Sequence, residues 1–136
     1  MKLNMIPPAI IRIRKDLGGY GYARGLYVSL PVDTTPHQLP HELTHVKQWW
    51  MLTCISAAVI YVAQMYVAAL PLEAMALSIG VHTGLYMVSK HYRFWAEAQA
   101  YRMSAKVSPE RTEDFAKMLY AYNTGRTLEQ CRKAIT

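Results

Sequence analysis

The stretch HELTHVKQWWMLTCISAAVIYVAQMYVAAL, residues 41–70, decides how this chain folds. It begins with polar side chains and then contains no charged residue over positions 49–70. As a helix that apolar part is about 30 Å long, because each residue of an α-helix adds about 1.5 Å. The length matches the hydrocarbon core of a bilayer, so the stretch predicts a long helix that lies in lipid or in an apolar protein environment.

Pro71 separates this helix from a second apolar stretch, residues 72–89. A proline between two helical patterns marks a helix boundary. We therefore expect an antiparallel hairpin of two helices over residues 35–105, each about 30 residues long, with a very short turn near residues 70 and 71. The apolar part of this hairpin is residues 49–89.

Both legs of the hairpin carry further local signals. Thr35-Pro36-His37-Gln38 has the S/T-x-x-Q form of a capping box, with proline at the first helical position. Pro40 costs a backbone hydrogen bond inside a helix, so a start at Leu39 or Pro40 is the alternative. In the return leg Gly80 and Gly84 have the G-x-x-x-G spacing that lets helix backbones approach closely, and we expect them to face the first helix.

The remaining segments are shorter. Residues 1–34 alternate and are punctuated by glycine, with Ile11–Arg14 and Gly25–Leu30 as the clearest strand patterns, so they predict two or three short antiparallel strands. Residues 106–136 predict a helical tail in which Thr127 caps a last short helix.

These patterns together predict one domain, residues 1–136, of the α+β class and mainly α. It has a short N-terminal antiparallel sheet, a long antiparallel helical hairpin and C-terminal helices.

Charged residues are 18% of the chain, below the roughly 25% of ordinary soluble domains, which indicates lipid or a large partner surface. Lys and Arg outnumber Asp and Glu by 15 to 9, which gives a solubilising surface or attraction to anionic headgroups. No dense basic run with interleaved aromatics indicates nucleic acid.

His41-Glu42-Leu43-Thr44-His45 is an H-E-x-x-H sequence near the start of the predicted first helix. Residues four apart lie on one helical face, so both imidazoles can reach one metal ion while Glu42 lies beside it as a general base. Zinc suits such a site because catalytic zinc uses three protein ligands and keeps a position for water, whose pKa it lowers toward about 7. We therefore expect Zn²⁺ as the cofactor, with His41 and His45 as two ligands.

A third zinc ligand has to come from elsewhere in the chain. If the turn lies near residues 70 and 71, the two histidines stand about 25 to 30 positions before it and Glu97 about 26 positions after it, so they are level in an antiparallel pair. Other candidates fit this register less well: Glu73, Glu110 and His91. The sequence thus predicts Glu97 as the third ligand, and a solvated helix residue is the alternative for this position.

Two blocks resemble the minimal gluzincin-type metallopeptidases, namely HELTHVKQ at residues 41–48 and EAQAY at residues 97–101. In that family an H-E-x-x-H-V-x-Q helix supplies two ligands and the base, and a downstream E-x-x-A-Y helix supplies a glutamate ligand. The resemblance covers roughly residues 25–105. It also implies that the strand before the first helix, Gly25–Leu30, offers an edge to an extended substrate. The long apolar insertion between the two blocks departs from the family pattern.

The functional hypothesis is a zinc-dependent endopeptidase that hydrolyses a peptide or protein substrate with a metal-activated water. Tyr101, His91 and Arg93 are candidates for oxyanion or substrate contacts, although such residues more often pack or lie on the surface. The alternative is a non-catalytic structural or binding subunit that keeps a zinc-peptidase-like fold within a homo-oligomer or larger assembly. Glu42 favours the enzyme, because a purely structural zinc site needs no base there.

The apolar hairpin predicts contact with membrane lipid through residues 49–89. Aromatic residues cluster at its zinc end, with basic residues just outside them: Trp49, Trp50, Tyr92, Phe94 and Trp95, then Lys47, Lys90 and Arg93. An aromatic belt with a positive flank is typical of the cytoplasmic membrane surface, where we expect the zinc site. The alternative is a soluble cytoplasmic or assembly-bound protein whose hairpin packs against protein.

Overall fold

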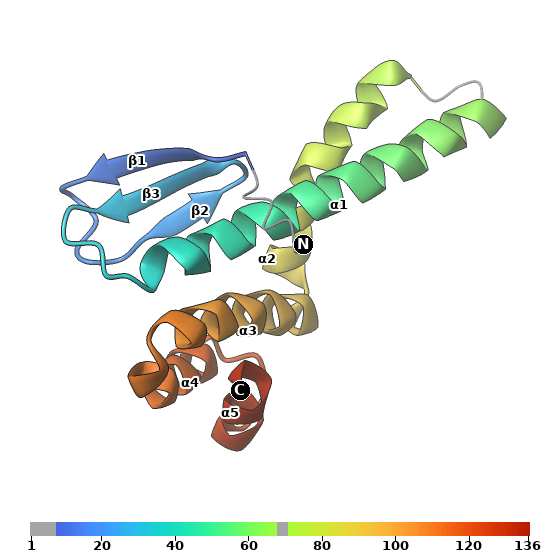
Figure 1. Ribbon diagram of the computed structural model, residues 1–136. Helices are drawn as coiled ribbons and strands as arrows, with labels where there is room; N and C mark the ends of the chain where they lie inside the picture. Colours follow the sequence, from blue (N-terminus) through green and yellow to red (C-terminus); the bar gives the residue numbers. More distant parts are fainter. Residues whose placement is uncertain (1–7, 68–70) are drawn as a thin grey trace, which may run out of the picture.

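The structure is a computed structural model that describes residues 8–67 and 71–136. A small sheet lies on one side of a long helix, and a group of helices lies on its other side (Figure 1). The elements, with η for 3₁₀-helices, are β1 (Ile10–Arg14), β2 (Tyr22–Arg24), β3 (Tyr27–Pro31), α1 (Gln38–Tyr66), η1 (Leu72–Gly80), α2 (Val81–Val88), α3 (Lys90–Val107), η2 (Pro109–Arg111), α4 (Thr112–Ala121) and α5 (Leu128–Ile135). The predicted fold class, α+β and mainly α, is confirmed.

The sheet is mixed, so the prediction of an all-antiparallel sheet is wrong. Its strand order is β1-β3-β2, with β1 parallel and β2 antiparallel to β3. The chain doubles back once into β2 and once more into β3, so β3 runs in the same direction as β1. A tight turn at Gly25 (φ +60°) joins β2 to β3. β3 is therefore the central strand, and the free edge expected at Gly25–Leu30 does not exist there.

The sheet packs against the first turns of α1 through β3, where every residue after Tyr27 is buried instead of every second one. Val28 and Leu30 face the helix and are 0% and 3% exposed, and Val46 of α1 closes this small core at 0% exposure. Burying side chains of this size is worth about 1.5–3 kcal/mol each. This core fixes the part of α1 that carries the H-E-x-x-H residues.

Helix α1 begins at Gln38, so the predicted start at Pro36 is wrong, and the alternative starts at Leu39 and Pro40 are one and two residues late. Pro40 is tolerated because it lies in the first turn, where its missing N–H has no helical partner to lose. Half of the predicted capping box is present: the backbone N–H of Thr35 donates to Oε1 of Gln38 at 2.9 Å. The side-chain nitrogen Nε2 of Gln38 also donates to the backbone carbonyl of Gly19 at 2.7 Å, so α1 is hydrogen-bonded to the loop that precedes β2.

The return leg is η1, α2 and α3 in succession, so the prediction of one continuous helix of about 30 residues is wrong. Ser89 has extended backbone angles (φ −107°, ψ 108°) and breaks the leg between α2 and α3. Its hydroxyl accepts the backbone N–H of Tyr92 at 3.2 Å, which is a normal helix N-cap. Residues 68–70, where we expected the turn near residues 70 and 71, lie outside the described part.

The contact between the two legs also differs from the glycine prediction. A Cβ atom placed on Gly80 or Gly84 would meet nothing within 4 Å, so these glycines do not face α1. The legs contact each other along their length through other residues: the indole N–H of Trp49 donates to the carbonyl of Ile79 at 2.9 Å, and the side-chain N–H of Gln64 donates to the carbonyl of Pro71 at 2.9 Å. The G-x-x-x-G prediction is wrong because η1 has three residues per turn, which shifts the side chains off the stripe that an α-helix would form.

The tail packs on α3 and forms the second core of the molecule. Buried side chains come from α3, α4 and α5: Ala98, Tyr101, Phe115, Ala116, Leu119, Cys131 and Ile135. The predicted cap at Thr127 is confirmed, since its hydroxyl accepts the N–H of Gln130 and the side chain of Gln130 accepts the N–H of Thr127. This core holds α3 against α1 from the side opposite to the sheet.

Candidate metal centre

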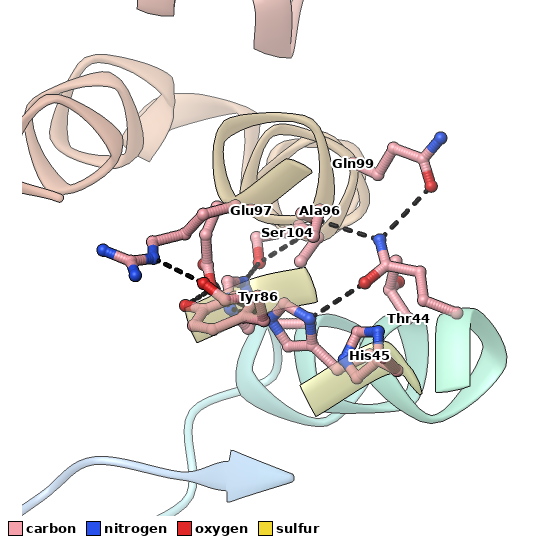
Figure 2. A network of polar contacts seen from close by, with 12 residues as sticks. Thr44, His45, Tyr86, Ala96, Glu97, Gln99 and Ser104 are labelled. Carbon is pink, nitrogen blue, oxygen red and sulfur yellow. Dashed lines mark hydrogen bonds and ion pairs between the residues drawn. The ribbon is translucent and has the colours of Figure 1, made fainter. Parts of the chain in front are cut away.

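Helices α1 and α3 bring the three predicted ligands together. His41 and His45 project from one face of α1 toward Glu97 on α3, and their ligand atoms lie within 4.8 Å of one another. Figure 2 shows His45 and Glu97 pointing toward each other between the helices. The predicted convergence of two imidazoles and one carboxylate is confirmed, and the three residues form a group that could hold a metal ion.

The separations within this group fit a tetrahedral ion. Nε2 of His41 and Nε2 of His45 are 3.3 Å apart. Glu97 places Oε2 3.6 Å from Nε2 of His41 and Oε1 3.5 Å from Nε2 of His45. Zinc bonds of about 2.0–2.1 Å at tetrahedral angles set ligand atoms about 3.4 Å apart. Two imidazole nitrogens and one carboxylate oxygen are also a normal catalytic zinc set, so the residues fit the ion.

The outer nitrogen of His45 has a buried partner. Its Nδ1 lies 3.1 Å from Oε1 of Gln48, which is one helical turn further along α1. The amide nitrogen of Gln48 donates to the carbonyl of Ala96 at 3.0 Å, so its oxygen is the atom turned to the ring. This assignment puts the proton of His45 on Nδ1 and leaves Nε2 free for a metal.

His41 is oriented by residues of α3. Its Nδ1 lies 3.4 Å from Oγ of Ser104, and that hydroxyl donates to the carbonyl of His37 at 3.2 Å. The ring of Tyr101 packs edge-on against His41, with centroids 4.5 Å apart. Both ligand histidines therefore present Nε2 toward Glu97, and Ser104 and Gln48 act as the outer hydrogen-bonding shell that metal-binding histidines need.

Burial and charge pairing set the protonation of the group. Burial acts to raise the pKa of Glu97, but the two imidazoles, 3.5 and 3.6 Å from its oxygens, hold that pKa below its ordinary value. Burial acts to lower the pKa of His45, but the Glu97 carboxylate outweighs burial and raises it. The Glu97 carboxylate and the His45 imidazole thus stabilise each other's charged forms, and a metal ion at this group competes with the proton of the ring.

Glu42 lies beside the three ligands, although it is only 6% exposed. Burial raises the pKa of its carboxyl above the ordinary value, against the opposite effect of the two histidines. Gly21 covers it so closely that a Cβ atom at that position would lie 3.3 Å from Oε1 of Glu42. A carboxylate with a raised pKa next to a metal site is suited to accept a proton near neutral pH.

The other candidate site residues lie at different distances from the ligands. Tyr101 contacts His41, and burial raises the pKa of its phenol. Arg93 donates to the carbonyls of Tyr86 and Met87, at 3.0 and 2.9 Å, rather than to the three ligands. His91 is exposed in the first turn of α3. Of these three, only Tyr101 has a ring contact with a ligand in the part of the chain that the structure describes.

Sequence reasoning missed Tyr86, whose hydroxyl donates to Oε1 of Glu97 at 2.5 Å (Figure 2). No spacing rule points to Tyr86, because the break at Ser89 turns α2 back toward the site. Gln48 and Ser104 were also not assigned roles. Two spacings in the sequence could have indicated them. Gln48 is three residues after His45, on the same face of the helix, and Ser104 is two helical turns after Glu97.

The chain was compared with protein-family models, curated proteins and solved structures, and none of them matched. The structure has one helix, Gln38–Tyr66, that is long and apolar enough to cross a membrane in the described part of the chain, and 6% of its most apolar window is buried. Some soluble proteins contain helices that meet the same criteria of length and composition.

Proposed function

We propose that this protein is a zinc-dependent endopeptidase of the gluzincin type that acts at the cytoplasmic surface of a membrane. The observation that carries the proposal is the convergence of His41, His45 and Glu97 with Glu42 beside them. Two imidazoles and one carboxylate leave a tetrahedral ion a fourth position for water, which a closed structural site lacks. The substrate is a peptide or protein segment.

Zinc, when bound, supplies Lewis acidity that polarises a peptide carbonyl and lowers the pKa of a water molecule. The residues of this chain do the rest. Glu42 accepts the proton of the attacking water and delivers it to the leaving amine, for which its raised pKa is suited. Ser104 and Gln48 keep the two imidazoles in the tautomer that binds metal. Tyr101 lies against His41, where its hydroxyl is a candidate donor to the substrate.

The test of catalysis is Glu42→Gln in the full chain, assayed on a labelled unfolded protein such as fluorescent casein. The amide cannot accept the proton, so cleavage should fall at least about 100-fold, while bound zinc stays at the wild-type level because Glu42 is not a ligand. Glu129→Gln, on the exposed face of α5, is the matched control and should cleave normally. Equal cleavage by Glu42→Gln and wild type would contradict the proposal.

A second candidate function is a non-catalytic subunit of a larger assembly that keeps zinc for structure. The degree of burial favours it, because the side chains of His41 and His45 are each 12% exposed and that of Glu97 is 2% exposed. A wild-type protein that binds zinc but cleaves no substrate, alone or with lipid, would favour this function over the peptidase.

The membrane part of the proposal rests on the exposed apolar surface of the hairpin. Large apolar side chains are exposed along both legs: Met51, Ile55, Val59, Tyr61, Val62, Met65, Tyr66, Leu77, Ile79, Met87 and Val88. The apolar part of α1 lies beside η1, whereas α2 continues to the metal centre, where Tyr86 contacts Glu97. Lys47 and Lys90 are exposed at the zinc end, which supports a cytoplasmic position for that end.

A further inference from the structure

The two oxygens of Glu97 have different surroundings. Oε1 accepts a hydrogen bond from the hydroxyl of Tyr86 at 2.5 Å. Oε2 is buried and has no hydrogen-bond partner in the part of the chain that the structure describes. A buried carboxylate oxygen without a partner costs free energy, so a positively charged occupant near Oε2 would be stabilising. Oε2 is also 3.6 Å from Nε2 of His41, on the side where the imidazoles converge.

We propose that Tyr86 is a positioning residue of the metal centre. By holding Oε1 it fixes the rotation of the Glu97 carboxylate, so that Oε2 is the oxygen presented to the ion. The inference rests on the proposed zinc site and adds a residue outside the two helices that supply the ligands. Hydrogen-bond partners of metal ligands typically change metal affinity 10–100-fold when removed.

Tyr86 is itself held firmly, which a positioning role requires. Arg93 donates to the carbonyls of Tyr86 and Met87 at 3.0 and 2.9 Å, and these carbonyls belong to the last turn of α2, where no helical N–H follows to bind them. The guanidinium also lies over the Tyr86 ring at 5.4 Å. The rings of Tyr86 and His45 are perpendicular, with centroids 6.4 Å apart.

Through Tyr86, the return leg of the hairpin contacts the candidate metal centre directly. Helix α2 belongs to the apolar leg, yet it contributes a hydrogen bond to a ligand that belongs to α3. The break at Ser89 makes this contact possible, because it redirects α2 relative to α3. Displacing α2 should therefore change the binding of metal, even though no ligand lies on that helix.

The test measures the zinc affinity of the purified full chain in detergent by competition with a chromophoric chelator. Tyr86→Phe removes only the hydroxyl and should weaken zinc binding about 10–100-fold. It should also shift the visible spectrum of the Co²⁺-substituted protein, because the carboxylate is free to rotate. Tyr92→Phe is the matched control: it removes a hydroxyl that contacts His82 rather than Glu97, and its zinc affinity should equal that of wild type.

Zinc affinity and a Co²⁺ spectrum of Tyr86→Phe that both match wild type would overturn the inference while leaving the proposed zinc peptidase intact. A wild-type protein that binds no zinc overturns both, so the two failures are distinguishable. If Tyr86→Phe does not fold, Arg93→Gln serves as the second variant, because it frees the carbonyls that anchor Tyr86 and keeps the hydroxyl. Arg93→Gln should then weaken zinc binding, and unchanged affinity would contradict the inference.

Discussion

The buried carboxylate of Glu97 gives the candidate site a physical reason to hold a cation. Its side chain is 2% exposed, and burial of a carboxylate without compensation is expensive. The two imidazoles compensate for part of this cost, and Tyr86 satisfies one oxygen, but Oε2 remains without a partner among the described residues. Oε2 is thus a buried acceptor that a cation bound among the three residues would satisfy.

The zinc affinity should depend on pH through His45. The pKa of His45 is raised, so below that pKa the ring carries a proton on each nitrogen and cannot bind the ion. Affinity should therefore rise with pH through the raised pKa of His45 and level off above it, with about one proton released per zinc bound in the acidic range. Calorimetric titrations in buffers of different ionisation enthalpy measure this release.

The same titrations on Glu129→Gln, at an exposed position of α5, are the control and should give the wild-type proton release. Zinc affinity of the wild type that is constant between about pH 5 and pH 8 would contradict the assigned protonation.

Helix α1 has two different surroundings along its length. Its first turns pack between the sheet and α3, whereas its second half exposes side chains such as Val59, which is 63% exposed. An apolar surface this large is unusual on a soluble monomer and indicates an interaction with lipid or protein. The hairpin of α1, η1 and α2 is therefore the part of the chain to test for membrane insertion.

We predict that the protein floats with liposomes containing anionic lipid and resists extraction by alkaline carbonate. Val59→Arg should greatly reduce both the flotation and the resistance to carbonate extraction, because a charge near the bilayer centre costs about 2.5–3.5 kcal/mol. Tyr120→Arg, on the exposed face of α4, is the matched control, since Tyr120 is 54% exposed and lies outside the hairpin. A wild-type protein that is monomeric and soluble without detergent, and that does not float, would refute membrane insertion.

Local signals predicted the ligand-bearing parts of the fold better than its return leg. The positions of His41, His45 and Glu97 could be predicted because helical spacing and the antiparallel register are set by the backbone alone. The break at Ser89 was missed, although serine is a common N-cap, because serine also occurs inside helices and the contacts from Arg93 to the carbonyls of α2 are seen only in the structure. The 3₁₀ geometry of η1 is likewise a departure from the α-helix that its composition favours.

The strand directions and the outer shell of the site required the three-dimensional arrangement. Strand patterns give no direction, so a sheet predicted as antiparallel proved to be mixed, with β3 in the centre. Tyr86 and Ser104 contact candidate ligands on other helices, which requires the packing of the sheet on α1 and of the tail on α3 (Figure 1). The fold thus places two independently packed cores around one buried polar group.

The most direct test is the metal content of the purified protein after dialysis, measured by mass spectrometry for the wild type and for Glu97→Ala. The wild type should contain about one zinc per chain, because the three residues supply one tetrahedral set of ligands. Glu97→Ala should lose most of its zinc, while Glu129→Ala, on the exposed face of α5, should keep it. A wild type without zinc, or a Glu97→Ala protein with the full amount and unchanged affinity, would contradict the account.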